Sequence, residues 1–410
     1  MAPLIQPNPK HPLRRFPSPT LPPVARSRVA LGLTAFAAQG RLALQVCRDC
    51  GTVHYPPQEA CRRCLSPRLD WRPQDGAGEL ISDTVLRHSN ELYFRARAPL
   101  RLGSVRLDAG PTAIAFVHGA CPAPPARVRL RAALDRAGAA VLAALPDNEV
   151  TTMADDRVLR ELTNDPAGRK ILITDGRAAV AVPLARALAA AGADLIYVGM
   201  PEPWPPAAVV AYAPIAEALV RPLDVTDSES VVDLAAEIGG KVDILINTAE
   251  HHRPHAILAR GIETARAEME VNYFGLLRLA QSFAPALRAR AVDGAAAWVN
   301  LLSIFALTSF PPHGTFSASK AAAHSLAQGL RAELRGAGLR VVNVYPGPIE
   351  EDWNDRLPPP KLAPAALAGA IVAALRDGVE DVYPGDVAQD WLARWRDNPK
   401  ALEREVAAIL

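Results

Sequence analysis

One stretch of the chain decides the fold, and it reads Trp298-Val-Asn-Leu-Leu-Ser303-Ile, then a proline-containing loop, then Thr315-Phe316-Ser-Ala-Ser-Lys320. The apolar run that ends at Ser303 predicts a buried strand. The alanine-rich segment from Ser317 onward predicts a helix. Because Phe316 and Lys320 are one helical turn apart, a helix places them on the same face, one above the other. The sequence therefore predicts a serine at a strand end that faces an aromatic ring and a lysine.

Strand and helix patterns alternate throughout residues 169–410, on both sides of this stretch. Alternation of this kind predicts an α/β doubly wound parallel sheet of the Rossmann type. The expected strands are 170–174, 194–198, 242–247, 297–302 and 340–345, and the expected helices are 265–290 and those that start near residues 182, 227 and 317.

The serine, aromatic and lysine pattern resembles the active site of the short-chain dehydrogenase/reductase family. That family carries a serine, a tyrosine thirteen positions later and a lysine four positions after the tyrosine. Ser303 and Lys320 are in register with it, but Phe316 stands in the tyrosine position. Phenylalanine has no proton to exchange with a substrate, and loss of a positioned acid or base costs on the order of 10²–10⁴ in rate. We therefore expect weak or absent reductase chemistry.

The family also implies NAD(P) as cofactor, held at a glycine-rich turn after the first strand. The family pattern Thr-Gly-x-x-x-Gly-x-Gly is replaced here by Thr174-Asp175-Gly176-Arg-Ala-Ala179-Val-Ala181, so all three signature glycines are lost. Glycine at such positions allows close approach of the backbone to phosphate. These changes weigh against NAD(P) binding, and a divergent turn that still works is the alternative. The remaining family positions that we assign to a degenerate cofactor site are Thr174, Gly176, Asp224, Asn247, Pro346 and Gly347.

The retained catalytic positions of the family are Asn272, Ser303 and Lys320. We interpret them as structural hydrogen-bond formers, with Asn272 kinking its helix; the alternative is that they still work in a site that has lost its acid. Glu250 replaces a family glycine beside the cofactor channel, and Glu350-Glu351 stands where the family commonly has a threonine. His313 is a candidate substitute acid, although a loop histidine is more often a surface residue. His251, His252 and His255 form either a metal-binding cluster or, as we expect, a solvated loop.

Two Cys-x-x-Cys pairs form the strongest local signal, Cys47-Arg-Asp-Cys50 and Cys61-Arg-Arg-Cys64. Two such knuckles can place four thiolates tetrahedrally around Zn²⁺. The alternatives are two disulfides, which are rare in the cytosol, or redox dithiols. We predict a structural zinc site, which is closed and therefore not catalytic. Cys121 is interpreted as an ordinary small apolar residue.

The N-terminal part divides into four predicted segments: a proline-rich arm (1–28), a helix and zinc ribbon (29–75), an OB-like barrel (76–146) and a polar linker (147–168). The helix is expected over 29–44, and the barrel strands over 79–86, 92–98, 100–107, 112–118 and 128–134. Residues 29–146 resemble a family of zinc-ribbon plus OB-fold proteins associated with acyl-CoA metabolism. That resemblance implies an acyl-CoA ligand and a thiolase, hydratase or retro-aldolase partner subunit.

Composition excludes several other classes. The chain has 410 residues, a net charge of +2 and 50% hydrophobic residues, which predicts no general affinity for nucleic acid. No apolar stretch is long enough to span a bilayer and no secretory signal is recognised, so we expect a cytoplasmic protein. Residues 1–150 carry 20 Lys and Arg against 11 Asp and Glu, an excess that favours a phosphorylated ligand or an acidic partner surface.

These observations favour an accessory, redox-inactive subunit of an acyl-CoA-processing complex. One alternative is an NAD(P)-dependent oxidoreductase acting on a 3-hydroxyacyl-CoA, and another is a stand-alone acyl-CoA-binding protein. By resemblance to the dehydrogenase family, homo- or hetero-oligomers are expected to form through helices 265–290 and 317–336.

Overall fold

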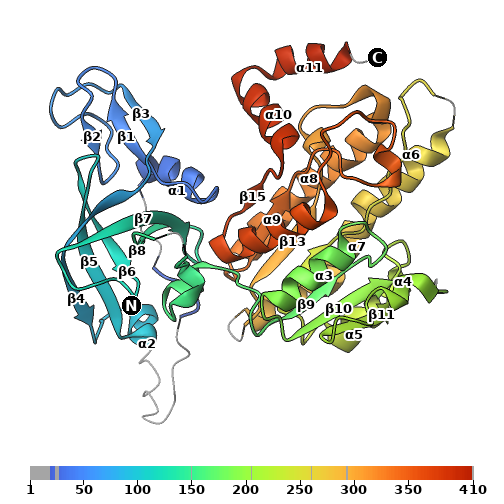
Figure 1. Cartoon of the computed structure of the whole chain (residues 1–410), viewed down its shortest axis with the longest axis horizontal. Helices are drawn as coiled ribbons and strands as arrows, with labels where there is room; N and C mark the ends of the chain where they lie inside the picture. The colour runs from blue at the N-terminus through green and yellow to red at the C-terminus, as the bar shows by residue number, and fades with distance from the viewer. Residues whose placement is uncertain are drawn as a thin grey trace, which may run out of the picture.

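The computed structural model describes residues 19–23, 27–148, 150–204, 206–259, 261–291 and 294–408. Most of the predicted arm, 1–28, lies outside these residues. The described chain forms two halves, a ribbon with a barrel and a larger α/β half (Figure 1). No helix among the described residues has the length and apolarity needed to cross a membrane.

The ribbon begins with α1 (Leu31–Ala37), which is shorter than the predicted helix 29–44. Gly40 adopts a φ of +67°, which ends the helix, and the chain then enters β1 (Ala43–Cys47). Strand β1 pairs antiparallel with both β2 (Val53–His54) and β3 (Leu69–Pro73). This three-stranded sheet carries the two cysteine knuckles.

A closed barrel follows, and its strand order is β4-β5-β6-β8-β7. One strand prediction was wrong, because residues 92–98 contain helix α2 (Leu92–Arg97). The guanidinium of Arg97 lies 3.7 Å from the ring centroid of Tyr93, a contact that the i, i+4 spacing of a helix allows. The fifth strand is instead the alanine-rich β8, which lacks the alternation that marks a half-buried strand. The barrel strands are β4 (Ala77–Leu86), β5 (Leu100–Leu107), β6 (Thr112–Val117), β7 (Ala126–Leu134) and β8 (Ala140–Pro146).

The segment predicted as a polar linker, 147–168, is packed against the barrel. Its two 3₁₀ turns, Met153–Asp155 and Leu159–Leu162, bury three apolar side chains. These side chains join a small core with Leu145 of β8. The connection between the two halves is therefore held in place by its own apolar contacts.

The α/β half contains seven parallel strands in the order β11-β10-β9-β12-β13-β14-β15, which confirms the predicted fold class. Such an order reverses direction between β9 and β12, and ligands of open α/β sheets bind at that point. All five predicted strands are present, whereas β11 and β15 were not predicted. The strands are β9 (Lys170–Ile173), β10 (Leu195–Met200), β11 (Ala218–Pro222), β12 (Ile244–Asn247), β13 (Ala297–Leu301), β14 (Arg340–Val344) and β15 (Asp381–Val382).

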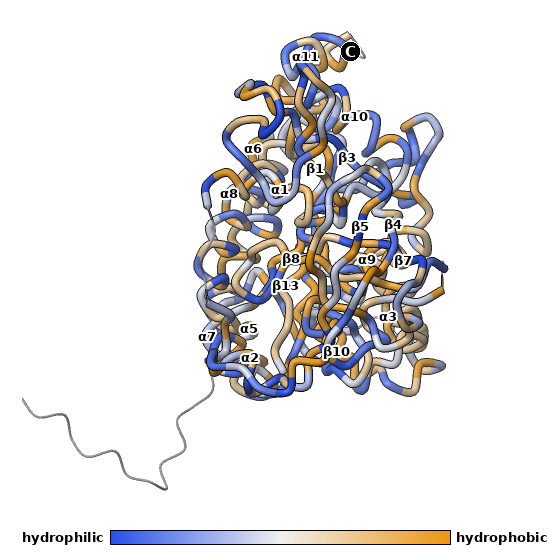
Figure 2. The backbone as a smooth tube through the Cα atoms, turned by 90° about the vertical axis from the view of Figure 1, so that its left-hand side faces the viewer, coloured by the Kyte–Doolittle hydropathy of each residue, from blue (hydrophilic) through white to orange (hydrophobic). Residues whose placement is uncertain are grey.

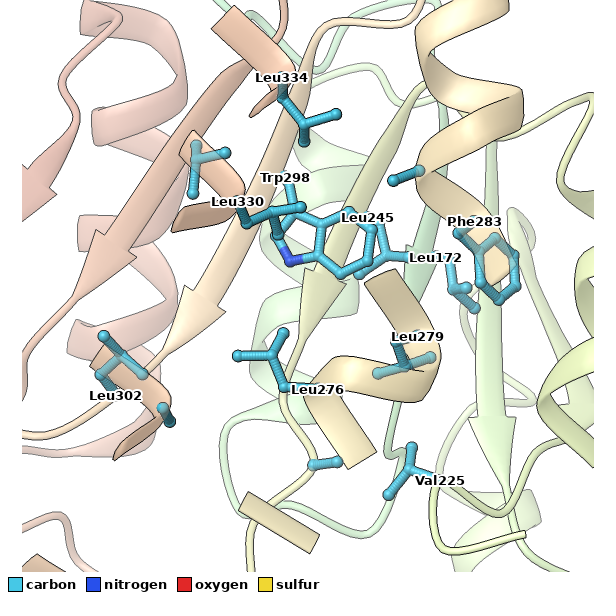
Figure 3. Packing of buried hydrophobic residues seen from close by; sticks show 14 of the residues in the cluster. Leu172, Val225, Leu245, Leu276, Leu279, Phe283, Trp298, Leu302, Leu330 and Leu334 are labelled. Carbon is cyan, nitrogen blue, oxygen red and sulfur yellow. The ribbon is translucent and has the colours of Figure 1, made fainter. Parts of the chain in front are cut away.

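Helices cover both faces of this sheet, because its strands are apolar on both sides. One face packs against α5, α7 and α8, with Trp298 of β13 at the centre of the cluster (Figure 3). The other face packs against α3 and α9. Hydrophobic segments accordingly run through the middle of the molecule (Figure 2). The helices are α3 (Ala181–Ala190), α4 (Pro206–Val210), α5 (Ser228–Ile238), α6 (Ile262–Met269), α7 (Leu276–Arg290), α8 (Gly314–Arg335), α9 (Pro364–Asp377), α10 (Asp386–Asp397) and α11 (Pro399–Ala407).

Candidate functional site

The carboxyl ends of β12, β13 and β14 meet the start of α8 at one small cavity. Phe316 and Ser303 both line it, as the sequence predicts. Only about 10 Å³ of this cavity is open to a water-sized sphere. A single water needs roughly that much space. The other lining residues are Glu250, His252, Leu302, Phe305, Pro346, Gly347, Pro348, Ile349, Glu351 and Asn354.

Lys320 is held in a buried ion pair that sequence analysis missed. Its Nζ lies 2.6 Å from Oε2 of Glu250 and donates to the carbonyl oxygen of Leu301 at 3.0 Å. The Lys320 side chain is 2% exposed and that of Glu250 is 15% exposed. The signal was present in the sequence, because Glu250 replaces a family glycine, but its partner lies on a distant helix. The ammonium group is therefore already neutralised by the protein itself.

The ring of Phe316 is covered on one face by the His252 ring, which stacks on it with the ring centroids 3.7 Å apart. Nε2 of His252 in turn contacts Nδ1 of His313. Both histidines are buried, so the expectations of a surface His313 and of a solvated loop at His252 were wrong. Burial lowers the pKa of His313 to about 4 and is also the main cause that lowers the pKa of His252. Both rings are therefore neutral at pH 7, with one nitrogen donating and the other accepting.

Asn272 lies in the π turn Glu270–Gly275 that separates α6 from α7. Its Oδ1 accepts from the backbone N–H of His251 at 2.9 Å, and its Nδ2 donates to the carbonyl oxygen of His251 at 2.9 Å and to Oγ of Ser319 at 2.8 Å. Side-chain bonds of this kind compete with the regular helix ladder. Asn272 therefore ties the loop after β12 to α8 through its side chain.

Ser303 makes a local hydrogen bond. Its Oγ accepts from the backbone N–H of Phe305 at 3.2 Å, which caps the 3₁₀ turn Ile304–Ala306. Pro346 accepts from the backbone N–H of Ile304 at 2.9 Å through its carbonyl oxygen. A Cβ on Gly347 would lie 3.0 Å from Cβ of Val387, so this glycine serves the packing of α10. Each of these family positions thus has a structural partner inside the protein.

The turn after β9 contains an internal carboxylate. Oδ1 of Asp175 accepts from the backbone N–H of Arg177 at 2.9 Å and from its Nε at 3.0 Å. In a dinucleotide-binding turn, backbone N–H groups at a helix N-terminus bind phosphate instead. The hydrogen bond to Asp175 is the main cause that raises the pKa of Arg177. Arg177 therefore compensates the charge of Asp175 by pairing with it.

Gly176 is required by packing. A Cβ at this position would lie 2.5 Å from Cγ1 of Val198, and the Gly176 carbonyl oxygen accepts from the hydroxyl of Tyr212 at 2.6 Å. Thr174 and Asn247 link β9 to β12, because the threonine hydroxyl donates to Oδ1 of Asn247 at 2.8 Å.

The last predicted cofactor residue, Asp224, is engaged in its own turn. It accepts from Oγ1 of Thr226 at 2.7 Å and from the backbone N–H of Thr226 at 2.9 Å. The carboxylate therefore has local partners at the place where the family docks the adenine.

Glu351 gives a pH prediction. Burial, followed by the nearby Glu250 carboxylate, raises its pKa from 4.5 to about 8. Between pH 4.5 and about pH 8 the folded state binds more protons than the unfolded state. The free energy of unfolding therefore falls as the pH rises through this range and levels off above about pH 8. In Glu351→Gln this dependence should disappear, with a gain on the order of 1–3 kcal/mol near pH 9. Urea denaturation of both proteins near pH 6 and pH 9 measures it, and parallel pH dependences would contradict it.

The four ribbon cysteines are arranged to hold zinc. Sγ of Cys47 lies 3.5 Å from Sγ of Cys64, and Sγ of Cys50 lies 3.5 Å from Sγ of Cys61. Tetrahedral zinc with bonds of about 2.3 Å separates its sulfurs by roughly 3.8 Å. All four cysteines are free, and their ligand atoms lie within 4.8 Å of one another, so the geometry favours one metal over two disulfides.

The backbone of each knuckle supports this arrangement. Cys47 and Cys61 each accept, through their carbonyl oxygens, from a residue four positions later, Gly51 at 3.0 Å and Leu65 at 2.9 Å. Both later residues adopt a positive φ. Cys121 lies apart from the group, buried with its thiol donating to Ala144, as predicted.

Among the described residues, one other group has metal-ligand chemistry: Glu250, His252 and Glu351. Its ligand atoms lie within 4.8 Å of one another, but Lys320 already supplies the positive charge beside Glu250. His251 and His255 are not members, so the predicted alternative of a three-histidine metal cluster is wrong. We assign no metal to this group.

Models of known protein families match each of the two halves of the chain. Residues 169–361 match the short chain dehydrogenase family. Residues 34–70 match the ChsH2 rubredoxin-like zinc ribbon domain, and residues 71–134 match the ChsH2 C-terminal OB-fold domain. The site and the sheet thus define a Rossmann-type dehydrogenase domain, preceded by a zinc ribbon and a small barrel.

Several individual proteins are similar in sequence or structure to the α/β half. Galactitol 2-dehydrogenase (L-tagatose-forming) of Cereibacter sphaeroides is 33% identical over 227 residues, which cover 49% of this chain and 87% of that protein. An uncharacterised oxidoreductase of Staphylococcus saprophyticus is 32% identical over 163 residues, 38% of this chain and 67% of that protein. The crystal structure of a short chain dehydrogenase from Burkholderia cenocepacia in complex with NADP has a TM-score of 0.55 and 34% identity, and the match covers 59% of this chain and 98% of that one.

The chain belongs to the short-chain dehydrogenase family. It joins a domain of an oxidoreductase fold to a ribbon and OB-fold module of a type associated with acyl-CoA processing.

Proposed function

We propose that this protein is an accessory, redox-inactive subunit of an acyl-CoA-processing complex. Its partner would be a thiolase or a related acyl-CoA enzyme, and its ribbon and barrel would bind acyl-CoA. The observation that carries the redox-inactive part is the buried ion pair between Glu250 and Lys320 beside Phe316. In the family this lysine acts on the catalytic tyrosine and the cofactor. Here its charge is taken up by a carboxylate, and the tyrosine is absent.

The small cavity beside Phe316 also supports the proposal, because it leaves little room for a nicotinamide ring. The His252 ring stacks on Phe316, and Glu351 lines the same cavity, of which about 10 Å³ is open. To admit a nicotinamide, the protein would have to separate Glu250 from Lys320 and displace a buried histidine ring. Separating a buried ion pair is strongly unfavourable. These contacts therefore support loss of cofactor binding at the reactive end.

The adenosine end is unfavourable to NADP in particular. A groove beyond β10 and β11 is lined by six carboxylate residues: Glu202, Asp224, Asp227, Glu229, Asp233 and Glu237. An acid just after the second strand of a Rossmann fold binds the ribose hydroxyls of NAD, whereas NADP needs a cation for its extra phosphate. Any residual binding should therefore favour NADH over NADPH.

Dinucleotide titration tests the redox-inactive part. We expect no saturable change in NADH or NADPH fluorescence with millimolar cofactor, and no reduction of a 3-oxoacyl-CoA. Phe316→Tyr alone should not restore reduction, because Glu250 still neutralises Lys320. An active 3-oxoacyl-CoA reductase serves as the positive control. Tight binding of either dinucleotide together with turnover by the parent protein would overturn this part.

The partner assignment comes from the resemblance of the ribbon and barrel, and co-expression tests it. A thiolase-like subunit from the same genome should co-elute with the protein in gel filtration. Separate elution from every thiolase-like and hydratase-like subunit tested would favour the stand-alone acyl-CoA-binding protein.

Oligomerisation through the α/β half is part of the same proposal. A groove along α7 and α8 is lined by small and apolar side chains, among them Leu277, Ala280, Leu326 and Gly329. Helix faces of this composition are suited to pairing with another subunit.

A second candidate function is an NAD(P)-dependent oxidoreductase acting on a 3-hydroxyacyl-CoA. It is favoured by the retained Ser303 and Lys320 and by the 34% identity to a dehydrogenase crystallised with NADP. This candidate requires Glu250 to leave Lys320 when the cofactor binds. The dinucleotide titration separates the two functions.

A further inference from the structure

A cavity of about 680 Å³ lies between the two halves of the molecule, away from the dehydrogenase site. One wall is formed by α1 and the turn between β7 and β8, and the other by the end of α8 and the start of β14. Figure 1 shows α1 on the side of the N-terminal half that faces the α/β half. Pockets that bind organic ligands measure about 300–1,000 Å³ and occur preferentially between domains. The cavity therefore has the size and the position of a ligand site.

Its lining is rich in arginine. Five arginines and three acidic residues contribute to the walls, an excess of two positive charges: Arg136, Arg169, Arg331, Arg335 and Arg340 against Asp135, Glu161 and Glu380. Glu161 is itself paired with Arg97, and Arg331 with Asp381; neither partner is part of the lining, so the excess of two positive charges remains. The cavity therefore has an excess of positive charge in a partly desolvated space, where charge interacts strongly.

Carbonyl oxygens, more than carboxylates, hold these arginines in place. Nη2 of Arg136 donates to Ala291 at 2.8 Å, across the boundary between the halves. Nε of Arg335 donates to Ala137 at 3.3 Å in the opposite direction, and Nη2 of Arg340 donates to Leu134 at 2.9 Å. The same guanidinium groups thus join the halves and surround the cavity.

Arg331 forms ion pairs with Asp381 at 2.7 Å and with Glu380 at 3.8 Å. The carboxylates of Glu380 and Asp135 also act on Arg340, at longer range. Burial lowers the pKa of Arg340 to about 10, which leaves it charged at neutral pH. Its hydrogen bonds go to the carbonyl oxygens of Leu162 at 3.1 Å and Leu134 at 2.9 Å, and an anion would stabilise this buried cation further.

The wall formed by α1 has a different character. It presents Leu31, which is 59% exposed, together with Ala35 and Ala38. On the same wall, beside α1, the turn Asp135–Gly138 contributes Arg136, with Gly138 at a φ of +73°. The opposite wall contributes Arg331, Arg335 and Arg340. An apolar helix surface that faces arginines across a cavity suits a ligand with a flat or apolar part and several negative charges. Arginine is well matched to phosphate, because its fork of N–H groups binds two oxygens.

We infer that this interdomain cavity binds the phosphorylated adenosine end of a coenzyme A thioester, with Arg136 and Arg335 as phosphate ligands. The identity of the ligand rests on the proposed function, whereas the cavity itself selects a nucleotide-sized organic phosphate. The ligand would then contact both halves. Binding should therefore strengthen their association and slow hydrogen exchange in α1.

Calorimetry on the full-length, zinc-loaded chain tests the inference, with acetyl-CoA as the probe. Arg335→Gln and Arg136→Gln should each weaken binding about tenfold or more, because each removes a charge-assisted contact. Arg335→Lys should recover part of the affinity. Ala35→Trp should block binding by filling the cavity, and its position on an exposed helix face keeps the fold intact. Arg186→Gln, on the exposed face of α3, is the matched control and should bind within twofold of the parent protein.

Competition identifies the ligand class. Adenosine 3′,5′-bisphosphate should compete with acetyl-CoA, and inorganic phosphate at equal concentration should not. Equal competition by inorganic phosphate would overturn the assignment to a nucleotide. If the parent protein and the variants Arg335→Gln and Ala35→Trp bound acetyl-CoA with equal affinity, the cavity would not be the binding site. The protein would then bind acyl-CoA at another surface, and the proposed function would not be contradicted. If the parent protein bound no acetyl-CoA at all, the inference would fail. The dinucleotide titration would still test, independently, the proposal that the protein has no reductase activity.

Discussion

Lys320→Met is expected to lower the free energy of unfolding by about 3–5 kcal/mol, because it leaves the largely enclosed Glu250 carboxylate without its partner. The two side chains are 2% and 15% exposed and lie 2.6 Å apart. The variant also removes the hydrogen bond from Nζ to Leu301, which connects α8 to the end of β13. Both losses act at the centre of the degenerate site, so the effect should be among the largest of any single substitution there.

The double variant Glu250→Gln/Lys320→Met should recover most of this loss. Replacing both members of a buried ion pair with neutral groups is often neutral or stabilising. The matched control is the pair of Glu263 and Arg266 on α6, which are 77% and 71% exposed. Removing Arg266 there should cost no more than about 1 kcal/mol. Urea denaturation measures all three proteins, and a Lys320→Met effect as small as that of the control would mean that the buried pair does not form.

Cys61→Ser should abolish zinc binding and unfold the ribbon. Structural zinc sites contribute apparent binding free energies of about 10–16 kcal/mol, and most of this energy is folding energy. Cys61 is buried, and its thiol lies 3.5 Å from that of Cys50. Without the metal, the two knuckles have little apolar core of their own. We therefore expect loss of the ribbon and of the α1 surface that packs beside it.

Metal content and protease sensitivity measure this effect. The parent protein should contain about one zinc ion per chain, and Cys61→Ser should contain almost none and be cleaved between 40 and 76. Cys121→Ser is the control, because Cys121 is also buried but lies outside the four-cysteine group. It should keep its zinc. A zinc-free parent protein that stays folded and resists protease would contradict the structural role of the metal.

The two substitutions act on independent parts of the molecule. The ribbon and the dehydrogenase site occupy opposite halves, and each has its own core. Their effects on stability should therefore add. The interdomain cavity is the place where the halves do interact, through Arg136, Arg335 and Arg340.

Local pattern predicted much of the fold. The two cysteine pairs predicted the ribbon, and the alternation of strands and helices predicted the parallel sheet and five of its seven strands. Pattern failed where the signal was short or ambiguous. Residues 92–98 contain a helix, and β8 (Ala140–Pro146) was missed because its alanines carry no alternation. His313 was expected at the surface but is 2% exposed, because the rings of His252, Phe305 and Phe310 pack around it.

The sequence by itself determined which groups are present at the site. Spacing alone placed Phe316 one turn from Lys320 and set four thiols in two knuckles, because helices and tight turns have fixed local geometry. Only the tertiary structure decided what those groups contact. Glu250 meets Lys320, and Arg335 meets Ala137, across long stretches of chain. Such contacts depend on how whole elements pack, and no local periodicity encodes which distant side chain will lie opposite.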